Sequence, residues 1–228
     1  SPSPEPFSEQ NPFVLCFIGG LFYHLHGDCI EDLFEAVSQI RKKIPWIEFN
    51  LYGQRQPTDF LEDLIHLDGF THHGIVMPLE KKFEIMEKAH CFVIPSSFKE
   101  EKHRHYRYSF PTKLPELIAS GRPILSYGPK ETATNRILET NNLGLRIHDR
   151  SVQKLVESLE ILISQYQESR CMSMVDKPVW QKGMKQGFNR RVGRCTVQQI
   201  VPLHIDHILI RQCVQYAQAL QRFQPDAG

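Results

Sequence analysis

The sequence has almost no net charge, no long apolar run and no paired cysteines. Lys and Arg number 27 against 26 Asp and Glu, and the resulting charge of +1 argues against a general binder of nucleic acids or membranes. No apolar run approaches the roughly 18 residues needed to span a bilayer. The six cysteines contain no Cys-x-x-Cys pair, which favours neither a zinc knuckle nor a disulfide framework. We therefore expect a reduced, cytoplasmic setting.

Sequence fingerprints of the best-known nucleotide sites are also missing. Neither Gly-x-Gly-x-x-Gly nor Gly-x4-Gly-Lys-Ser/Thr occurs, so the usual dinucleotide site and the P-loop are not indicated. The first six residues have neither the basic region nor the apolar region of a signal peptide.

What is present is an ordinary globular composition, with 41% hydrophobic and 23% charged residues in 228. At about 150 residues per domain, this length predicts one large domain or a domain with an appendage. We divide the chain into a proline-rich linker or cut end (1–12), a main domain (13–170) and a tail (171–228). The tail combines a basic stretch at 180–195 with a helix from Pro202, which we expect to pack on the main domain.

Short apolar runs alternate with helical patterns throughout the main domain. We predict strands at 13–18, 47–52, 74–77, 91–95, 123–127 and 144–147. The helices between and after them are expected around 33–43, 59–67, 81–89, 112–120, 133–140 and 152–166, with Gly121 as the C-terminal glycine of one. This alternation predicts right-handed βαβ units and a Rossmann-like, doubly wound parallel sheet.

Ligands of such sheets bind at the carboxyl ends of the strands, and two stretches fall there. Gly19 and Gly20 follow the first strand and allow a close backbone approach, although a strand-end glycine pair is usually just a turn. In the run from Ser109 to Ile124, Thr112 can cap a helix and Lys113 adds a positive charge. Glu116 can accept two ribose hydroxyls. Spacing alone leaves open that Glu116 forms a capping box or a first-turn contact with the helix dipole, and that Lys113 is solvated.

Neighbouring histidines and a polar segment at 98–107 complete the candidates. The segment is predicted to be a long loop at the ligand edge. The pairs at 24 and 26, 72 and 73, and 103 and 105 share no convincing ligand spacing with a carboxylate or cysteine, so no protein-bound metal is expected. His26 and His73 are candidates for ligand contact, with packing or solvation as the alternative.

Residues 13 to about 166 resemble the C-terminal, nucleotide-sugar-binding domain of retaining GT-B-fold glycosyltransferases with a Glu-x7-Glu motif, the glycosyl transferases group 1. The resemblance is carried mainly by residues 113–125, KLPELIASGRPIL, and secondarily by residues 80–89 and 142–145. It implies one half of a GT-B fold that binds a nucleoside-diphosphate sugar, for example a UDP-sugar or a GDP-sugar. It also implies that no cofactor is needed. It also implies an N-terminal acceptor domain, in cis or in trans, without which this chain is expected to be catalytically silent.

The resemblance gives the candidate site its residues. Glu116 is expected to hold the ribose, and the stretch from Ser109 to Leu114 the diphosphate. Ile75 and Val76 are expected to face the base. The full set of nucleotide-sugar-binding candidates is Gly19, Gly20, His26, Gly53, Ile75, Val76, Ser109, Phe110, Thr112, Lys113, Leu114 and Glu116.

Departures from the family pattern leave the catalytic residues unassigned. Tyr108 stands eight positions before Glu116, where the family has its first Glu. The family's two cations after the first strand align with Gly20 and His26. Two alternatives therefore remain open: half of a sugar-nucleotide epimerase, and a non-catalytic interaction module. The basic stretch at 180–195 further suggests peripheral attachment to a membrane surface.

Overall fold

The computed structural model describes residues 7–54, 64, 66–76, 79–109, 111–141 and 143–168. Within these ranges, six parallel strands form one sheet in the order β3-β2-β1-β4-β5-β6. The strands are β1 (Phe13–Ile18), β2 (Ile47–Tyr52), β3 (Phe70–His72), β4 (Cys91–Pro95), β5 (Ile124–Tyr127) and β6 (Leu145–Ile147). This is the predicted Rossmann-like, doubly wound sheet. The predicted helix at 59–67 falls largely outside the described residues, and the tail from 171 entirely so.

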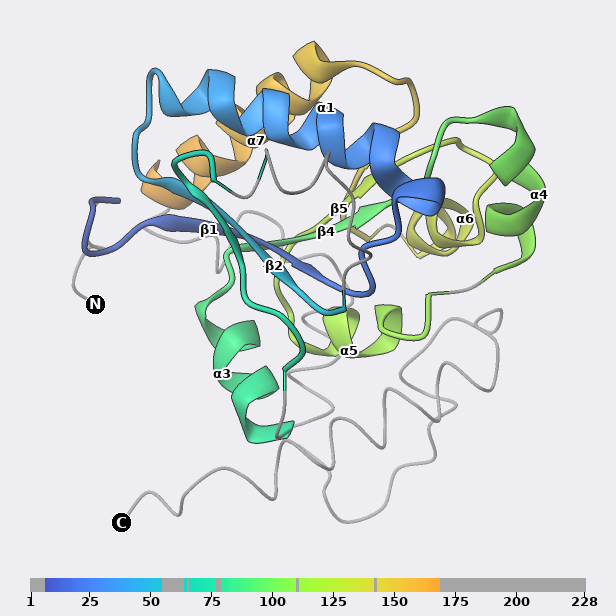
Figure 1. Cartoon of the computed structure of the whole chain (residues 1–228), viewed down its shortest axis with the longest axis horizontal. Coiled ribbons are helices and arrows are strands. Elements are labelled where there is room, and N and C mark those ends of the chain that lie inside the picture. Colours follow the sequence, from blue (N-terminus) through green and yellow to red (C-terminus); the bar gives the residue numbers. More distant parts are fainter. Residues whose placement is uncertain are drawn as a thin grey trace.

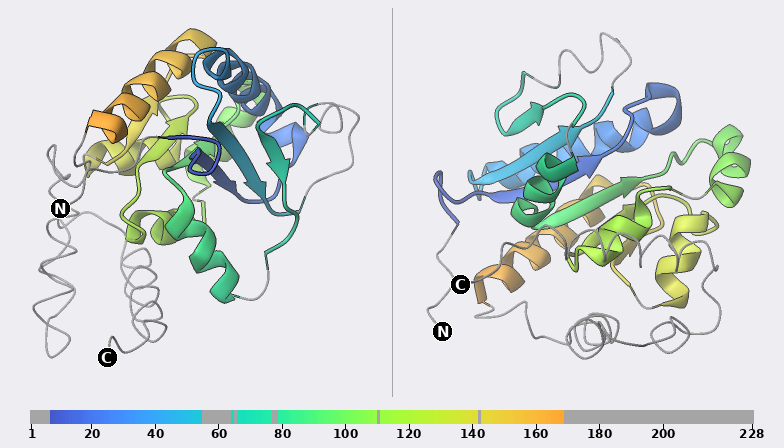
Figure 2. Two further views of the ribbon diagram at one scale, coloured as in Figure 1. Left: turned by 90° about the vertical axis from the view of Figure 1, so that its left-hand side faces the viewer. Right: turned by 90° about the horizontal axis from the view of Figure 1, so that it is seen from below.

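Helices cover both faces of the sheet, giving three layers (Figure 1; Figure 2). The long helices α1 (Tyr23–Arg41) and α7 (Val152–Glu168) lie side by side on one face. The opposite face carries α3 (Leu79–Lys88) and α5 (Leu114–Ala119). Two further helices, α4 (Glu100–Tyr108) and α6 (Ala133–Thr140), lie together near one end of the sheet.

The apolar runs of the sequence form the middle layer because both of their faces are buried. Along β1, Leu15 and Phe17 belong to the cluster beneath α1 and α7, whereas Cys16 belongs to the cluster beneath α3 and α5. The strand period of two residues places alternate side chains on opposite faces, so a continuous apolar run is required. Cys91 of β4 is also fully buried, and burial raises the pKa of its thiol to about 12.

Two predicted elements were wrong in position or type, and α1 begins at Tyr23, ten residues before the helix that was predicted around 33–43. The third strand is Phe70–His72 rather than 74–77, because Phe70 anchors it by stacking on Phe34 of α1 with ring centroids 4.2 Å apart. The predicted polar loop at 98–107 contains α4. This helix has Glu100 and Glu101 in its first turn and Arg107 in its last, an arrangement that favours a helix through its dipole rather than through an apolar stripe.

Candidate functional site

The described residues form a pocket of about 200 Å³ at the carboxyl ends of β1 and β4. These two strands are neighbours, but the chain leaves them toward opposite edges of the sheet, which makes their junction the topological switch point. Ligands of open α/β sheets bind in the crevice at this point. The wall is built by β1, β4, the start of α1, the end of α4 and the segment leading into α5.

Seven of the twelve candidate residues line this pocket: Gly19, Gly20, His26, Ser109, Thr112, Lys113 and Leu114. Phe110 lies outside the described residues. Gly53, Ile75, Val76 and Glu116 are not part of the pocket lining. Ile75 follows β3 with 68% of its surface exposed, because the strand already ends at His72. The His73 ring stacks on Tyr52, and its Nε2 is hydrogen-bonded to Asn50 Oδ1. Its ring contacts are therefore with neighbouring side chains of the domain.

Gly53 follows β2 and lies against the backbone of Gly19, which follows β1 and lines the pocket. The Gly19 N–H donates to the Tyr52 carbonyl at 2.8 Å, and the Gly53 N–H donates to the Gly74 carbonyl at 2.7 Å. Gly53 has φ = 139°, and a Cβ built on it would overlap the Gly19 carbonyl oxygen. A residue without a side chain is therefore needed for this approach.

His26 lies in the pocket wall at a kink in α1, with φ = −141° and ψ = 15°. Its Nε2 is 2.8 Å from the Gly20 carbonyl oxygen and its Nδ1 is 3.1 Å from the Tyr106 hydroxyl. The Tyr106 hydroxyl itself donates to the Leu25 carbonyl at 2.6 Å. Burial lowers the pKa of His26, partly offset by the Gly20 carbonyl and by Asp28, while His24 and His105 lower it further.

The hydrogen bonds of His26 can be made in two protonation states. A carbonyl oxygen only accepts, so Nε2 carries a proton toward Gly20. When the imidazole is neutral, Nδ1 accepts from the Tyr106 hydroxyl. When it is protonated, Nδ1 donates to that hydroxyl, which in turn donates to the Leu25 carbonyl. The site therefore contains a side chain that can take up a positive charge beside the pocket.

Lys113 brings a basic side chain to the pocket lining, but the helix that follows it differs from the prediction. α5 begins at Leu114 instead of 112, and Lys113 rather than Thr112 occupies the N-cap position, with no side-chain capping bond. The Leu114 N–H is already used by the Pro111 carbonyl at 3.0 Å. Burial lowers the pKa of Lys113, and nearby Lys82 lowers it further while Glu116 opposes the shift. The predicted C-terminal glycine, Gly121, is confirmed with φ = 71°.

Glu116 makes no capping bond, but it lies in the first turn of α5, where a carboxylate interacts favourably with the helix dipole. Its Oε2 forms an ion pair with Lys82 of α3, and the two side chains are only 28% and 16% exposed. Sequence reasoning missed Lys82, Tyr106 and Ser96, which the fold brings to the site or its edge. Lys82 precedes Glu116 by 34 residues on another helix, so no local spacing could reveal the pair.

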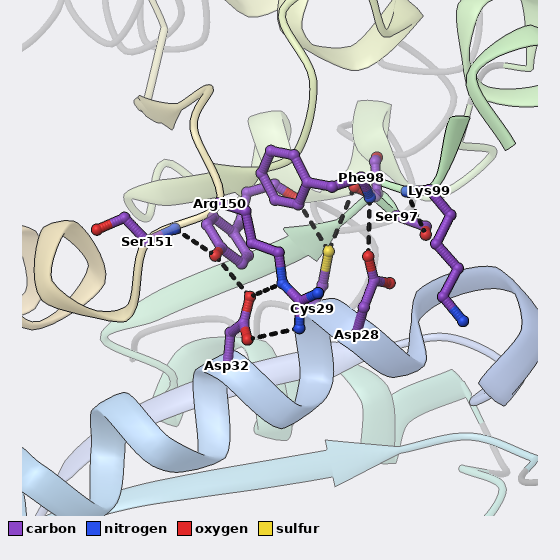
Figure 3. A network of polar contacts seen from close by, with 10 residues as sticks. Asp28, Cys29, Asp32, Ser97, Phe98, Lys99, Arg150 and Ser151 are labelled. Carbon is purple, nitrogen blue, oxygen red and sulfur yellow. Dashed lines mark hydrogen bonds and ion pairs between the residues drawn. The ribbon is translucent and has the colours of Figure 1, made fainter. Parts of the chain in front are cut away.

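A buried polar network fixes α1 relative to the loops around the pocket (Figure 3). The Asp28 carboxylate accepts the Phe98 N–H at 2.9 Å, which holds the chain as it leaves β4. One turn later, Asp32 receives both Nε and Nη2 of Arg150, at 2.8 and 3.0 Å. The network therefore ties the kinked start of α1 to the segments that enter α4 and α7.

Metal-ligating side chains do not converge anywhere in the part of the chain that the structure describes: no group of three or more His, Cys, Asp or Glu could hold an ion. Among the same residues, no helix has the length and apolar character to cross a membrane.

A parallel, doubly wound sheet defines a Rossmann-like α/β protein, and its pocket lies at the switch point, where open α/β sheets bind their ligands. The chain belongs to the family described as glycosyl transferases group 1, whose model matches residues 12–165. None of the curated protein sequences matches the chain.

Solved glycosyltransferase structures share the fold at low sequence identity. The C-terminal domain of a glycosyl transferase group 1 family protein (LpcC) from Francisella tularensis is 17% identical, with a TM-score of 0.54; the match covers 83% of this chain and 94% of that one. Sucrose-phosphate synthase from Thermosynechococcus elongatus is 15% identical, with a TM-score of 0.56, covering 94% of this chain and 47% of its own. The pneumococcal O-GlcNAc transferase GtfA, solved with UDP and GlcNAc, is 17% identical, with a TM-score of 0.52 and coverages of 96% and 38%.

The matches cover different shares of the three related chains. It corresponds to nearly all of the separate LpcC domain but to less than half of the synthase and GtfA chains. They give no support to the epimerase or interaction-module alternatives.

Proposed function

We propose that this chain binds a nucleoside-diphosphate sugar and serves as the donor-binding part of a glycosyltransferase. The observation that carries the proposal is the pocket at the switch point, lined by Gly19, Gly20, His26 and Lys113, in a member of a glycosyltransferase family. Glycines give a phosphate access to the backbone, and the two side chains offer positive charge to it.

In this role the chain acts mainly by electrostatics. Sugar transfer breaks the bond between the anomeric carbon and a diphosphate oxygen, and the acceptor hydroxyl supplies the replacing oxygen. Negative charge then accumulates on the leaving diphosphate. Lys113 and protonated His26 stabilise that charge from the pocket wall, while Glu116 holds the ribose and fixes the position of the nucleotide.

The acceptor site belongs to a second domain in this proposal, supplied in cis or in trans. The whole synthase and GtfA chains are more than twice as long as the part that this chain matches, which leaves room in them for such a domain. Transfer by the 228-residue chain alone, with any nucleotide sugar and acceptor, would contradict this division of roles. The proposal names no particular base or sugar, and the titrations below distinguish the bases. It also includes a cytoplasmic location at a membrane surface.

Replacing Glu116 by Ala is expected to weaken nucleotide binding by about 1–3 kcal/mol, because charge-assisted hydrogen bonds to the ribose are lost. The measurement is calorimetric titration of the chain with UDP, GDP and ADP. Glu84→Ala is the matched control, because Glu84 is an exposed carboxylate of α3 that pairs with Lys81. Equal affinity of Glu116→Ala and the parent chain would place the ribose elsewhere, and binding of none of the three nucleotides would favour the interaction module.

Pyrophosphate is expected to raise the pKa of His26, because an anion in the pocket stabilises the imidazolium. Without the anion, burial lowers this pKa and favours the neutral ring. The ring signals are followed by NMR from pH 4 to 8 and assigned with His26→Gln. His90, which accepts the Val14 N–H and whose pKa is lowered by burial to about 4, serves as the internal control. An unchanged His26 midpoint with pyrophosphate present would remove this residue from the anion site.

A further inference from the structure

The pairing of Lys82 with Glu116 assigns a role to a lysine outside the pocket lining. Lys82 stands one helical turn before Met86, which packs in the same apolar cluster as Leu114 and Leu117 of α5. This packing brings α3 against α5 and places Lys82 beside Glu116. The side chain of Lys82 is 16% exposed, whereas that of neighbouring Lys81 is 63% exposed. The Lys82 pair is therefore shielded from water far more than an ordinary surface ion pair.

Three charges meet at this point, and their balance depends on Lys82. Lys113 stands three residues before Glu116. Burial lowers the pKa of Lys113, the charge of Lys82 lowers it further, and Glu116 opposes the shift. Glu116 also forms the ion pair with Lys82. With Lys82 present, the Glu116 carboxylate is held toward α3. Of the two lysines, only Lys113 would then remain near the Glu116 carboxylate if Lys82 were removed. The carboxylate would then draw Lys113 away from the pocket that it lines.

We propose that Lys82 is a positioning residue that holds the Glu116 carboxylate for the ribose hydroxyls and leaves Lys113 available to the diphosphate. This inference rests on the proposed function. A carboxylate oxygen has two lone pairs, so Oε2 accepts from Lys82 and still accepts from a ribose hydroxyl. Lys82 thereby contributes to the preference for ribose without touching the nucleotide.

The test compares Lys82→Met with Lys81→Met in the 228-residue chain. Each variant is titrated by calorimetry with UDP, GDP and ADP and with their 2′-deoxy forms. We expect the parent chain and Lys81→Met to prefer the ribonucleotide roughly tenfold, the size of one charge-assisted hydrogen bond. We expect Lys82→Met to lose that preference and to bind the ribonucleotide more than roughly tenfold more weakly, because the ribose contact and the Lys113 charge at the diphosphate are both lost. Lys82→Arg is expected to retain the preference.

A merely structural role of Lys82 would give a different pattern. Lys82→Met would then weaken both nucleotide forms equally and keep the ribose preference, which overturns the inference but not the proposed function. If Lys82→Met does not fold by circular dichroism, Lys82→Met/Glu116→Gln is compared with Glu116→Gln alone. Identical nucleotide affinities for these two support the inference, and a further loss in the double variant overturns it. A parent chain that binds none of the nucleotides overturns the proposed function itself.

Discussion

Gly53→Ala is expected to destabilise the fold by about 3 kcal/mol or more and to abolish the pocket. The φ of 139° at this residue costs a side-chain-bearing residue about 1–3 kcal/mol, and the new methyl group would overlap the Gly19 carbonyl oxygen, adding an overpacking cost of similar size. Relief requires the ends of β1 and β2 to separate, and Gly19 is part of the pocket wall. Urea unfolding followed by circular dichroism measures the change.

Gly74→Ala is the matched control for this prediction. Gly74 also has a positive φ, 72°, but a Cβ on it has no neighbour within 4 Å in the described structure. Only the backbone cost of about 1–2 kcal/mol applies there. Equal destabilisation by the two substitutions would show that the contact with Gly19 contributes nothing.

Arg150→Met is expected to lower the free energy of unfolding by about 1–3 kcal/mol, because it leaves the Asp32 carboxylate without its cation. The Asp32 side chain is 11% exposed, whereas that of Arg150 is 48% exposed, so water screens part of the pair. Asp32 is 8% exposed and receives two hydrogen bonds from Arg150 and one, at 2.8 Å, from the Tyr127 hydroxyl (Figure 3). Tyr127 also accepts the Ser151 N–H at 2.9 Å. Loss of Arg150 therefore disturbs the start of α7 as well as α1. Thermal and urea unfolding measure the effect.

Lys154→Met provides the comparison for Arg150→Met. Lys154, four residues after Arg150, forms an ion pair with Asp149. Both side chains of that pair are mostly exposed. Water screens such a pair, so little change in stability is expected. A similarly small effect of Arg150→Met would mean that the Asp32 network is fully compensated by water.

Local patterns were sufficient for most of the fold. The strands at 13–18 and 91–95 lie where continuous apolar runs predicted them, since both of their faces are buried. The strand at 47–52 also lies where it was predicted, although Glu48 and Asn50 interrupt its apolar residues. β3 was misplaced because its anchor, Phe70, is defined by its stacking on Phe34, far away in the sequence. α4 was taken for a loop because apolar periodicity was the criterion, and this helix has none that reaches the core.

Part of the candidate site was also predictable from local patterns. Its backbone positions after β1 and before α5 follow from strand order, and the pocket brings them together. Contacts that depend on the packing of distant helices were not accessible to local patterns. Lys82 with Glu116, and His26 with Tyr106, each join residues of two separate elements. The nucleotide-sugar role of the twelve candidates stays a prediction.

The composition of α4 has a consequence for the dynamics of the pocket. None of its side chains for which burial is described is fully buried, and Tyr106 joins it to α1 by hydrogen bonds. Helices with few buried apolar contacts have low free energies of local unfolding. We therefore expect α4 to open at a lower free energy than the sheet and α1, which would make it the weaker wall of the pocket. A ligand that contacts Tyr106 or Ser109 would shift this local equilibrium toward the closed form, and part of its binding energy would be spent on ordering that wall.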